Sequence, residues 1–390
     1  MPAGDTGAAS DPELAGQAPL PPFAREEPLR LRDLADFLKA PVKAFFTQRL
    51  GVYFDGDDPA AEDQEPFSLD HLQRWLLNDE LIQAQARAVD AGEPLAEVRA
   101  ARLASIRRRG DLAPGGFGEA IAEELEAPMD KLFAEYREAL GRWPQPIAQE
   151  MEILFPAQTE DQSGDQPGTQ TLAIADWLGG LRADAAGQRG RVVLETSDLV
   201  KDRHYRGEKV IRHWVAHLAG NLGEGPLTTL VLSKVGQVEL APLPPDQARR
   251  YLAELLRAWD EGLRRPLPLA TRTAFAWLKG GDSGAARQTY EGGYNQQGEV
   301  ETDPYLARVY PDYAALTADG AFNRLAETLF GPLLAALPAA ASKPSVSDHA
   351  GEGRGASGGG VDRMEAVVKP PGMDSRRPPP GAPRAGAAKN

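Results

Sequence analysis

Two carboxylates near the middle of this 390-residue chain have the type and spacing for metal-dependent chemistry on a phosphodiester. Asp184 and Glu195 belong to the segment LAIADWLGGLRADAAGQRGRVVLETSD, which reads as a β-hairpin. A nuclease of this kind needs an Asp at a strand end and Glu/Asp-x-Lys on the next strand. The carboxylates hold a divalent metal ion, and the Lys positions or activates water. Asp176 is the other candidate for the first carboxylate, but the residue two beyond Glu195 is Ser197, so the required lysine is missing.

The sequence favours a structural interpretation of these carboxylates. Asp184 would lie in a polar hairpin turn and Glu195 would be an exposed carboxylate on a strand. A functional carboxylate needs a converging set of neighbours, and the sequence supplies none. The alternative is a vestigial metal site at Asp184 and Glu195, or an active metal-dependent DNA nuclease that uses the same two residues.

A run of cations follows the hairpin. Phosphates of a nucleic-acid backbone attract mobile cations, and an interleaved aromatic ring can stack on an unpaired base. The run could equally be a solvated loop and helix start, since charge runs are usually exposed. The candidate DNA contacts are Lys201, Arg203, Tyr205, Arg206, Lys209 and Arg212. A second basic run, Arg107 to Arg109, ends a predicted helix, where cations suit the helix dipole, and is interpreted as structural.

No metal or cofactor site is predicted in this chain. His213 and His217 are one helical turn apart, a spacing that recurs in zinc sites, but no HExxH glutamate lies between them and no third ligand is near in sequence. The chain has no cysteine, which excludes disulfides and cysteine-held iron–sulfur clusters. Gly280 and Gly281 lack the Gly-Lys-Ser/Thr of a phosphate loop, so no ATP site of that type is encoded.

Hydrophobic periodicity and composition divide the chain into four parts. Residues 1 to 27 and 339 to 390 are rich in small residues and proline and are predicted to be disordered. Residues 28 to 141 are predicted to form a helical subdomain, with helices at Leu69 to Ala91, Leu95 to Arg109 and Gly118 to Leu140. Residues 142 to 338 are predicted to form an α/β (α+β) domain. Its predicted strands are Ile147 to Phe155, Thr171 to Leu178, Arg191 to Thr196, Leu227 to Ser233 and Gln237 to Leu240, and its helices are Lys209 to Asn221 and Pro244 to Gly262.

The net charge of −14 argues against a general nucleic-acid binder, because nonspecific affinity for DNA depends on many Lys and Arg side chains. Acid is concentrated from Asp55 to Glu65, so any DNA contact would be local. The N-terminus has no signal peptide pattern, and no run approaches the ~18 apolar residues of a membrane-spanning helix. We therefore expect a cytoplasmic protein.

Several stretches together resemble one protein family. The first, from Leu29 to Asp58, is LRLRDLADFLKAPVKAFFTQRLGVYFDGDD, in which two short apolar helices meet at Pro41. It is similar to the opening of the C-terminal domain of the RecC family, the gamma subunit of exodeoxyribonuclease V. The likeness covers residues 29 to 337 in unbroken order. Further matching stretches are GDLAPGGFGE at 110 to 119, WVAHL at 214 to 218, EGLRRPL at 261 to 267, AWLK at 276 to 279 and YEG at 290 to 292.

The resemblance implies a restriction-endonuclease-like fold of the PD-(D/E)XK superfamily in residues 142 to 338, in a form known to be catalytically silent. It also implies that this chain is the C-terminal portion of a longer subunit. Its expected partners are RecB-like and RecD-like subunits, which supply ATP-driven translocation and Mg²⁺-dependent cleavage, and DNA, both duplex ends and unwound single strands. The family region contributes a strand-separating pin and takes part in double-strand break repair by homologous recombination. A pure assembly module with no DNA contact is the third possibility.

Overall fold

The computed structural model describes residues 18–23, 25, 27–54, 71–148, 150–156, 171–281, 283–293 and 297–338. The predicted C-terminal tail and the acidic connector at 55 to 65 lie outside these residues, as does most of the predicted N-terminal tail. Within the described part of the chain, no helix is long and apolar enough to cross a membrane.

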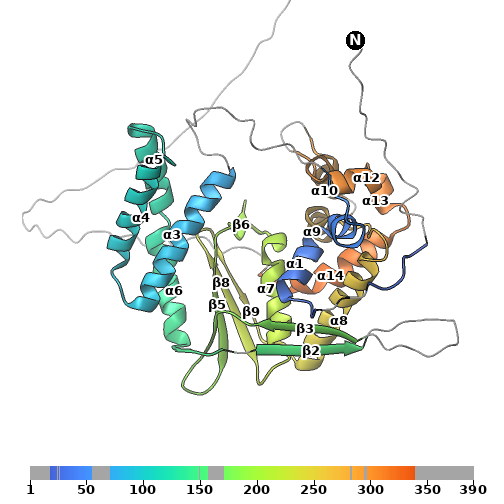
Figure 1. Cartoon of the computed structure of the whole chain (residues 1–390), viewed down its shortest axis with the longest axis horizontal. Coiled ribbons are helices and arrows are strands. Elements are labelled where there is room, and N and C mark those ends of the chain that lie inside the picture. The colour runs from blue at the N-terminus through green and yellow to red at the C-terminus, as the bar shows by residue number, and fades with distance from the viewer. Residues whose placement is uncertain are drawn as a thin grey trace, which may run out of the picture. The chain divides into compact units, whose positions relative to one another are not determined.

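A five-stranded mixed sheet forms the centre of the described structure (Figure 1). Its strand order is β1 (Gln145–Pro146), β4 (Leu181–Ala183), β5 (Arg189–Glu195), β8 (Leu227–Ser233) and β9 (Gln237–Leu240). The strands β5 and β8 are parallel over seven residue pairs, and the other neighbours are antiparallel. A parallel pair needs a long crossover connection, which here contains helix α7 (Gly207–Gly220).

Two smaller strand pairs accompany this sheet. The strands β2 (Glu150–Pro156) and β3 (Thr171–Trp177) form an antiparallel hairpin, and β3 also bridges to Leu29. The strands β6 (Val200–Lys201) and β7 (His204–Tyr205) form a short hairpin directly before α7. The candidate DNA contacts Lys201, Arg203 and Tyr205 therefore lie on this hairpin rather than in an irregular loop.

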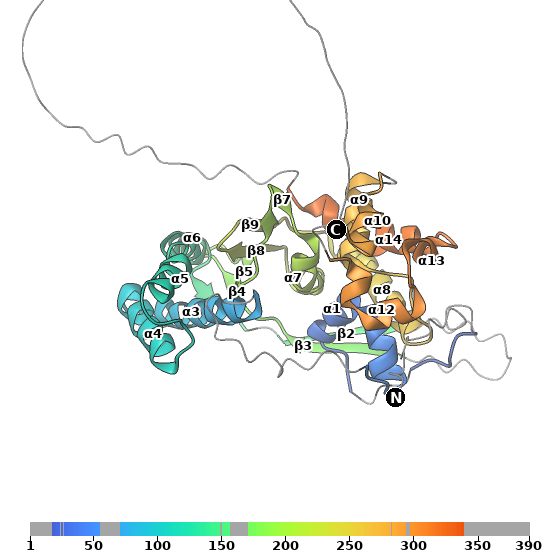
Figure 2. The same cartoon turned by 90° about the horizontal axis from the view of Figure 1, so that it is seen from above.

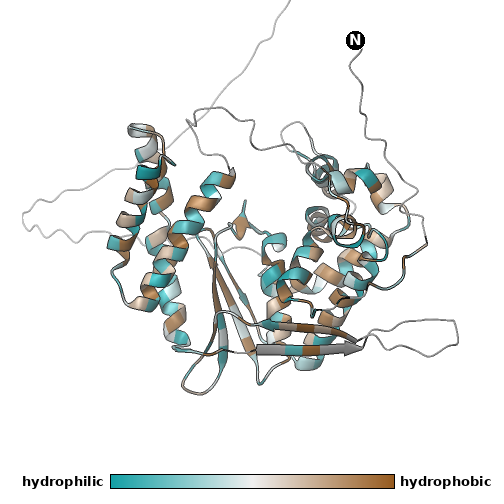
Figure 3. Cartoon of the chain, viewed as in Figure 1, coloured by the Kyte–Doolittle hydropathy of each residue, from teal (hydrophilic) through white to brown (hydrophobic). Residues whose placement is uncertain are grey.

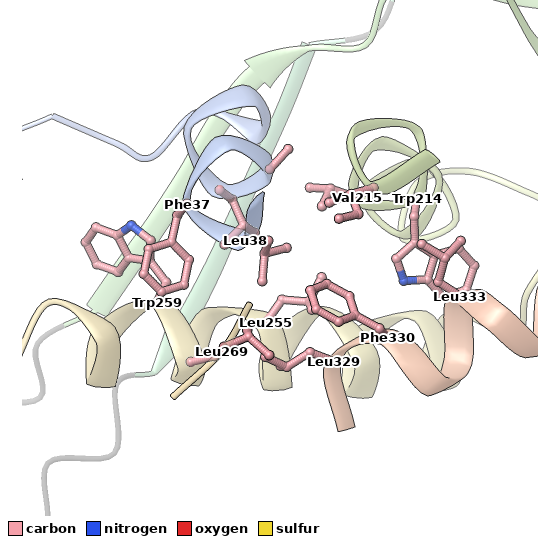
Figure 4. Packing of buried hydrophobic residues seen from close by; sticks show 14 of the residues in the cluster. Phe37, Leu38, Trp214, Val215, Leu255, Trp259, Leu269, Leu329, Phe330 and Leu333 are labelled. Carbon is pink, nitrogen blue, oxygen red and sulfur yellow. The ribbon is translucent and has the colours of Figure 1, made fainter. Parts of the chain in front are cut away.

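The larger hydrophobic core lies between α7 and five other helical segments. They are α1 (Leu31–Lys39), α2 (Pro41–Ala44), α8 (Pro245–Gly262), α9 (Thr271–Gly280) and α14 (Ala321–Ala336). Figure 4 shows Phe37 of α1 beside Trp259 of α8, and Phe330 of α14 further along the same core. Burial of such large side chains contributes about 1.5–3 kcal/mol each, so this core fixes α7 firmly against the sheet.

A second core lies on the opposite face of the sheet. Helices α3 (His71–Ala91), α4 (Leu95–Arg109), α5 (Gly116–Glu126) and α6 (Met129–Arg142) cover that face (Figures 1 and 2). Alternate residues of β8 enter the two cores, with Val231 in the larger one and Leu230 and Leu232 in the second. Both faces of the central strands are thus buried, which explains their apolar colour in Figure 3.

The prediction of mixed α/β structure with a helical part is confirmed, and several elements match closely. The predicted strands Leu227 to Ser233 and Gln237 to Leu240 have the bounds of β8 and β9, and α4 has its predicted bounds. The predicted single helix from Gly118 to Leu140 is wrong, because the chain turns at Ala127 and Pro128 between α5 and α6. The helices after α9 were not predicted individually: α10 (Ala285–Glu291), α11 (Glu299–Thr302), α12 (Pro304–Val309), α13 (Tyr313–Thr317) and α14.

Part of the predicted N-terminal tail packs on the larger core. Disorder was predicted from residue 1 to residue 27, yet the described residues 18 to 23 contact α8 and the turn that follows it. The Leu20 amide donates to the Arg264 carbonyl at 2.9 Å, and the Arg264 Nε donates back to the Leu20 carbonyl at 3.0 Å. The Phe23 ring lies 6.3 Å from the Trp259 ring. The apolar Leu20 and Phe23 explain why this stretch is held.

The predicted division at residue 141 stays a prediction. The helices before it take part in two different cores: α1 and α2 pack with α7 and α8, whereas α3 to α6 form the second core.

The side chain of Asp176 holds the start of α1, because its Oδ2 accepts a hydrogen bond from the Leu31 amide at 3.0 Å. Asp176 therefore has a structural role at a helix N-terminus.

The close contact between β5 and α6 gives a direct test of the second core. A Cβ added at Gly190 would lie 2.2 Å from Cδ2 of Trp143, whereas a Cβ at Gly179 would have no atom within 4 Å. We predict that Gly190→Ala destabilises the protein by about 1–3 kcal/mol through overpacking, and that Gly179→Ala is nearly neutral. Urea unfolding of the two variants measures this, and equal midpoints would contradict the packing.

Candidate nucleic-acid interface and its buried carboxylate

The structure does not bring Asp184 and Glu195 together. Asp184 lies in the turn before β5, where its Oδ1 accepts the amides of Ala186 at 2.9 Å and Gln188 at 2.8 Å. Glu195 is the last residue of β5. Seven residues of strand separate the two side chains by about 20 Å, whereas two carboxylates that share a metal ion have oxygens about 4 Å apart.

Glu195 is buried, so the expectation of an exposed strand carboxylate is wrong. The residue is 4% exposed, and helix α7 supplies most of its partners. Its Oε2 forms an ion pair with Nη2 of Arg212 at 2.6 Å and a hydrogen bond with Nε2 of His213 at 3.0 Å. Its Oε1 accepts the backbone amide of Ser197 at 2.9 Å. Ser197, two residues beyond Glu195, therefore contacts the carboxylate through its backbone amide.

These contacts set the protonation states of the cluster. Burial by itself would raise the pKa of Glu195, but the hydrogen bond from His213 and the charge of Arg212 outweigh it and lower the pKa to about 2. Burial lowers the pKa of His213 to about 4, against the opposing effect of Glu195. Glu195 is therefore charged and His213 neutral at neutral pH.

This cluster does not fit a divalent metal ion. Both oxygens of Glu195 are already engaged, since Oε1 accepts the Ser197 amide and Oε2 contacts His213 and the cationic Arg212. Among the residues that the structure describes, no group of three or more His, Asp or Glu side chains is arranged to hold a metal. His217, one helical turn after His213, has its Nδ1 3.0 Å from Thr229 Oγ1 and its Nε2 3.1 Å from the Ala241 carbonyl oxygen. These contacts join α7 to β8 and to the residue after β9.

The predicted cationic run divides into engaged and available side chains. Arg212 is engaged by Glu195, and Arg206 by Glu208 at 3.0 Å. Lys201 and Arg203 are exposed and have no ion-pair partner within the described part of the chain. Lys209 is half-buried, and its pKa is lowered by burial and by the nearby charges of Arg206 and Lys39. Tyr205 is half-buried in the hairpin.

Residues distant in sequence complete this surface. Lys279 at the end of α9 donates through Nζ to the Tyr205 carbonyl at 2.7 Å, which adds a cation from 74 residues away. Trp75 of α3 donates through its indole to Ser197 Oγ at 3.2 Å and remains 39% exposed. Nothing in the linear sequence joins Lys279 to the run, because only the packing of α9 against α7 and α14 brings it to the hairpin. We call Lys201, Arg203, Lys209 and Lys279 the cationic surface.

In the second basic run, Arg107 to Arg109, one of the three arginines has a structural partner. Arg109 pairs with Glu80 of α3 and with Asp111, both at 2.7 Å. Arg107 and Arg108 are exposed at the C-terminal end of α4 and have no ion pair within the described part of the chain. These two residues therefore form a natural comparison for the cationic surface.

Comparison with known proteins identifies the family. The model of the RecC C-terminal domain matches residues 26–282, which is more than half of the chain. The chain belongs to the RecC C-terminal domain family. The RecBCD enzyme subunit RecC of Escherichia coli K12 is 30% identical over 266 residues, covering 66% of this chain and 20% of that protein. The RecC subunit of Mycolicibacterium smegmatis is 27% identical over 266 residues, covering 67% and 21% respectively.

A shorter and more similar stretch links the chain to the RecC subunit of Haemophilus influenzae, with 43% identity over 56 residues. That match covers 14% of this chain and 5% of the relative. The chain spans about a fifth of the length of the E. coli and M. smegmatis relatives. The family match includes β5, α7 and the β6–β7 hairpin, so the buried carboxylate and the cationic surface both lie within the family domain.

The buried cluster predicts a specific loss of stability in acid. On unfolding, the pKa of His213 rises from about 4 toward 6.5 and the pKa of Glu195 rises from about 2 toward 4.5. The unfolded chain therefore binds more protons than the folded chain, and the stability falls as the pH drops. The contribution of His213 is lost between about pH 6.5 and 4, and that of Glu195 between about pH 4.5 and 2. Glu195→Gln should therefore cost about 2 kcal/mol at pH 7 and progressively less below pH 4.5.

Urea unfolding at a series of pH values measures this difference. The exposed Glu119 on α5 provides a matched control, since Glu119→Gln should change stability by less than about 0.5 kcal/mol at every pH. A Glu195→Gln variant as stable as the wild type at pH 7 would contradict the assignment of Glu195 as a buried ion-pair partner.

Proposed function

We propose that this chain serves as the C-terminal domain of a RecC-type subunit of an exodeoxyribonuclease V, guiding DNA and docking partner subunits without cutting DNA itself. The family membership supports the first part, since its relatives are named as RecC subunits of the RecBCD enzyme. The observation that carries the second part is Glu195, whose oxygens are held by Arg212, His213 and Ser197 instead of being open to a metal ion.

We further infer that the α/β part has a restriction-endonuclease-like fold that has lost its chemistry. The β4–β5 hairpin, the α7 crossover and the parallel strand β8 support this inference. Glu195 ends the strand where such a nuclease has its Glu-x-Lys, and α7 contributes His213 beside it. In this interpretation Arg212 supplies the positive charge that a metal ion would supply in an active relative.

Partners and reactions follow from the same proposal. RecB-like and RecD-like subunits would provide ATP hydrolysis, translocation and Mg²⁺-dependent cleavage, and the assembly would act in double-strand break repair by homologous recombination. This role implies a cytoplasmic location. The cationic surface is the part of the described chain best suited to DNA, because its ammonium and guanidinium groups come from three elements and most lack an acidic partner.

A cleavage assay tests the silent carboxylate. We predict that the purified chain does not digest linear duplex or single-stranded DNA in Mg²⁺ or Mn²⁺ above the level of an Asp184→Ala, Glu195→Ala double variant. Without a lysine or an open carboxylate, neither water activation nor metal binding is available at this site. Metal-dependent digestion that disappears in the double variant would establish the nuclease alternative.

A charge-reversal pair tests the DNA contact. We predict that Lys201→Glu with Arg203→Glu weakens DNA binding by about tenfold or more at low salt, and lowers the slope of log affinity against log salt by about two. Arg107→Glu with Arg108→Glu is the matched control and should change the affinity less than twofold. Both pairs are exposed, so thermal unfolding should remain within about 2 °C of the wild type. Equal DNA affinity in wild type and the Lys201, Arg203 variant would favour a pure assembly module.

A further inference from the structure

The turn of the β6–β7 hairpin has an unusual backbone for its residues. The register pairs Val200 with Tyr205 and Lys201 with His204, so Asp202 and Arg203 form a two-residue turn. Their φ values are 50° and 67°, and they are the two non-glycine residues with positive φ in the described chain. Such turns favour Asn-Gly or Asp-Gly, because glycine adopts positive φ without steric strain. Asp is tolerated here, but an arginine at the second position is disfavoured.

The base of the hairpin is held from several sides. The Val200 amide donates to the Val235 carbonyl at 3.1 Å, and the Arg206 amide donates to the Leu199 carbonyl at 2.8 Å. Lys279 fixes the Tyr205 carbonyl from α9. At Gly236, which has a φ of 92°, a Cβ would lie 2.4 Å from Val200, so the neighbouring β8–β9 turn packs tightly on the hairpin base. The turn is therefore presented on a fixed support.

No contact within the described chain offsets the strain at Arg203. The side chain is exposed and has no hydrogen-bond or ion-pair partner among the described residues, unlike Arg206 and Arg212. Residues in disfavoured conformations tend to cluster at functional sites, where the strained conformation holds a side chain in the geometry that binds a ligand. A glycine would adopt this backbone conformation with less strain. The presence of arginine at this position therefore points to a role for its side chain.

We propose that Arg203 is held out on this rigid turn to bind a backbone phosphate of a DNA strand through its guanidinium. A guanidinium donates two parallel hydrogen bonds to phosphate oxygens, and a fixed support reduces the entropy lost when the contact forms. Lys201 on the neighbouring strand and Lys279 below the hairpin provide further positive charge for a polyanion. The sequence predicted Arg206 and Arg212 as DNA contacts alongside Arg203. Glu208 and Glu195 hold these two side chains in ion pairs, so we do not assign them to the phosphate contact.

This inference rests on the proposed DNA-guiding function and adds the residue and the chemistry of the contact. If Arg203 has this role, it lowers the stability of the folded protein and raises the affinity for DNA. Asp202 provides the counterpart, since its replacement by glycine relieves the turn without removing a cation. The two glycine variants should therefore agree in stability and differ in DNA binding.

The experiment compares Arg203→Gly, Asp202→Gly and Arg203→Lys with the wild-type chain. Thermal unfolding measures stability, and fluorescence anisotropy with a fluorescein-labelled 20-nucleotide single strand and the matching duplex measures affinity over a salt series. Arg108→Ala on α4 controls for the loss of one exposed positive charge.

We expect both glycine variants to raise Tm by about 1–3 °C. Arg203→Gly should weaken DNA binding at least fivefold and lower the salt slope by about one, whereas Asp202→Gly should bind as tightly as wild type or more tightly. Arg203→Lys should keep the salt slope but lose about two- to threefold in affinity, because an ammonium cannot make the paired contact.

Three results would overturn the inference. Binding by Arg203→Gly equal to that of Arg108→Ala would remove Arg203 as the contact while leaving DNA guidance by this chain intact. An unchanged or lower Tm in both glycine variants would show that the turn is not strained. Absence of DNA binding by the wild-type chain, with the Tm rise still present, would defeat the DNA-contact part of the proposed function and the phosphate contact with it.

Discussion

A carboxylate buried at the end of a strand must be neutralised and hydrogen-bonded, and Glu195 meets this requirement through α7. Arg212 and His213 bring the helix to the end of β5, and the Ser197 amide turns the chain away from the sheet. The rest of the surface depends on this interaction. It pairs Arg212 with a carboxylate, engages both oxygens of Glu195, and holds the residues that lead from β5 toward the β6–β7 hairpin.

Burial of the sheet on both faces explains why this end of β5 and β8 is so well defined. The larger core holds α7 from one side, and α3 reaches the same end from the other. Thr196 donates to Asp79 of α3 at 2.6 Å, next to the contact between Trp75 and Ser197. Ion pairs and hydrogen bonds from two layers therefore meet within three consecutive residues, 195 to 197. A position with so many fixed partners suits a scaffold better than a catalytic centre that must admit substrate and metal.

The sequence predicted those features that depend on local periodicity and failed where distant elements meet. The strands β8 and β9 and the helix α8 follow from apolar runs and a proline start that are visible in a short window. The missing lysine at Ser197 was also visible. The burial of Glu195 was not, because it depends on a helix whose contacting residues lie 17 and 18 positions further along the chain. Asp176 shows the same limit, since its partner at the start of α1 is 145 residues away. Neither Lys279 nor Trp75 could be joined to the cationic run without the fold.

Metal titration can establish whether Glu195 is open to a divalent cation. Isothermal titration calorimetry with Mn²⁺ would compare the wild-type chain with Glu195→Gln at pH 7, where Glu195 is charged and thus competent to bind a cation if its oxygens were open. We expect the two proteins to give the same weak or absent heats, because Arg212, His213 and Ser197 already occupy the carboxylate. A saturable single site in the wild type that is lost in Glu195→Gln would contradict it.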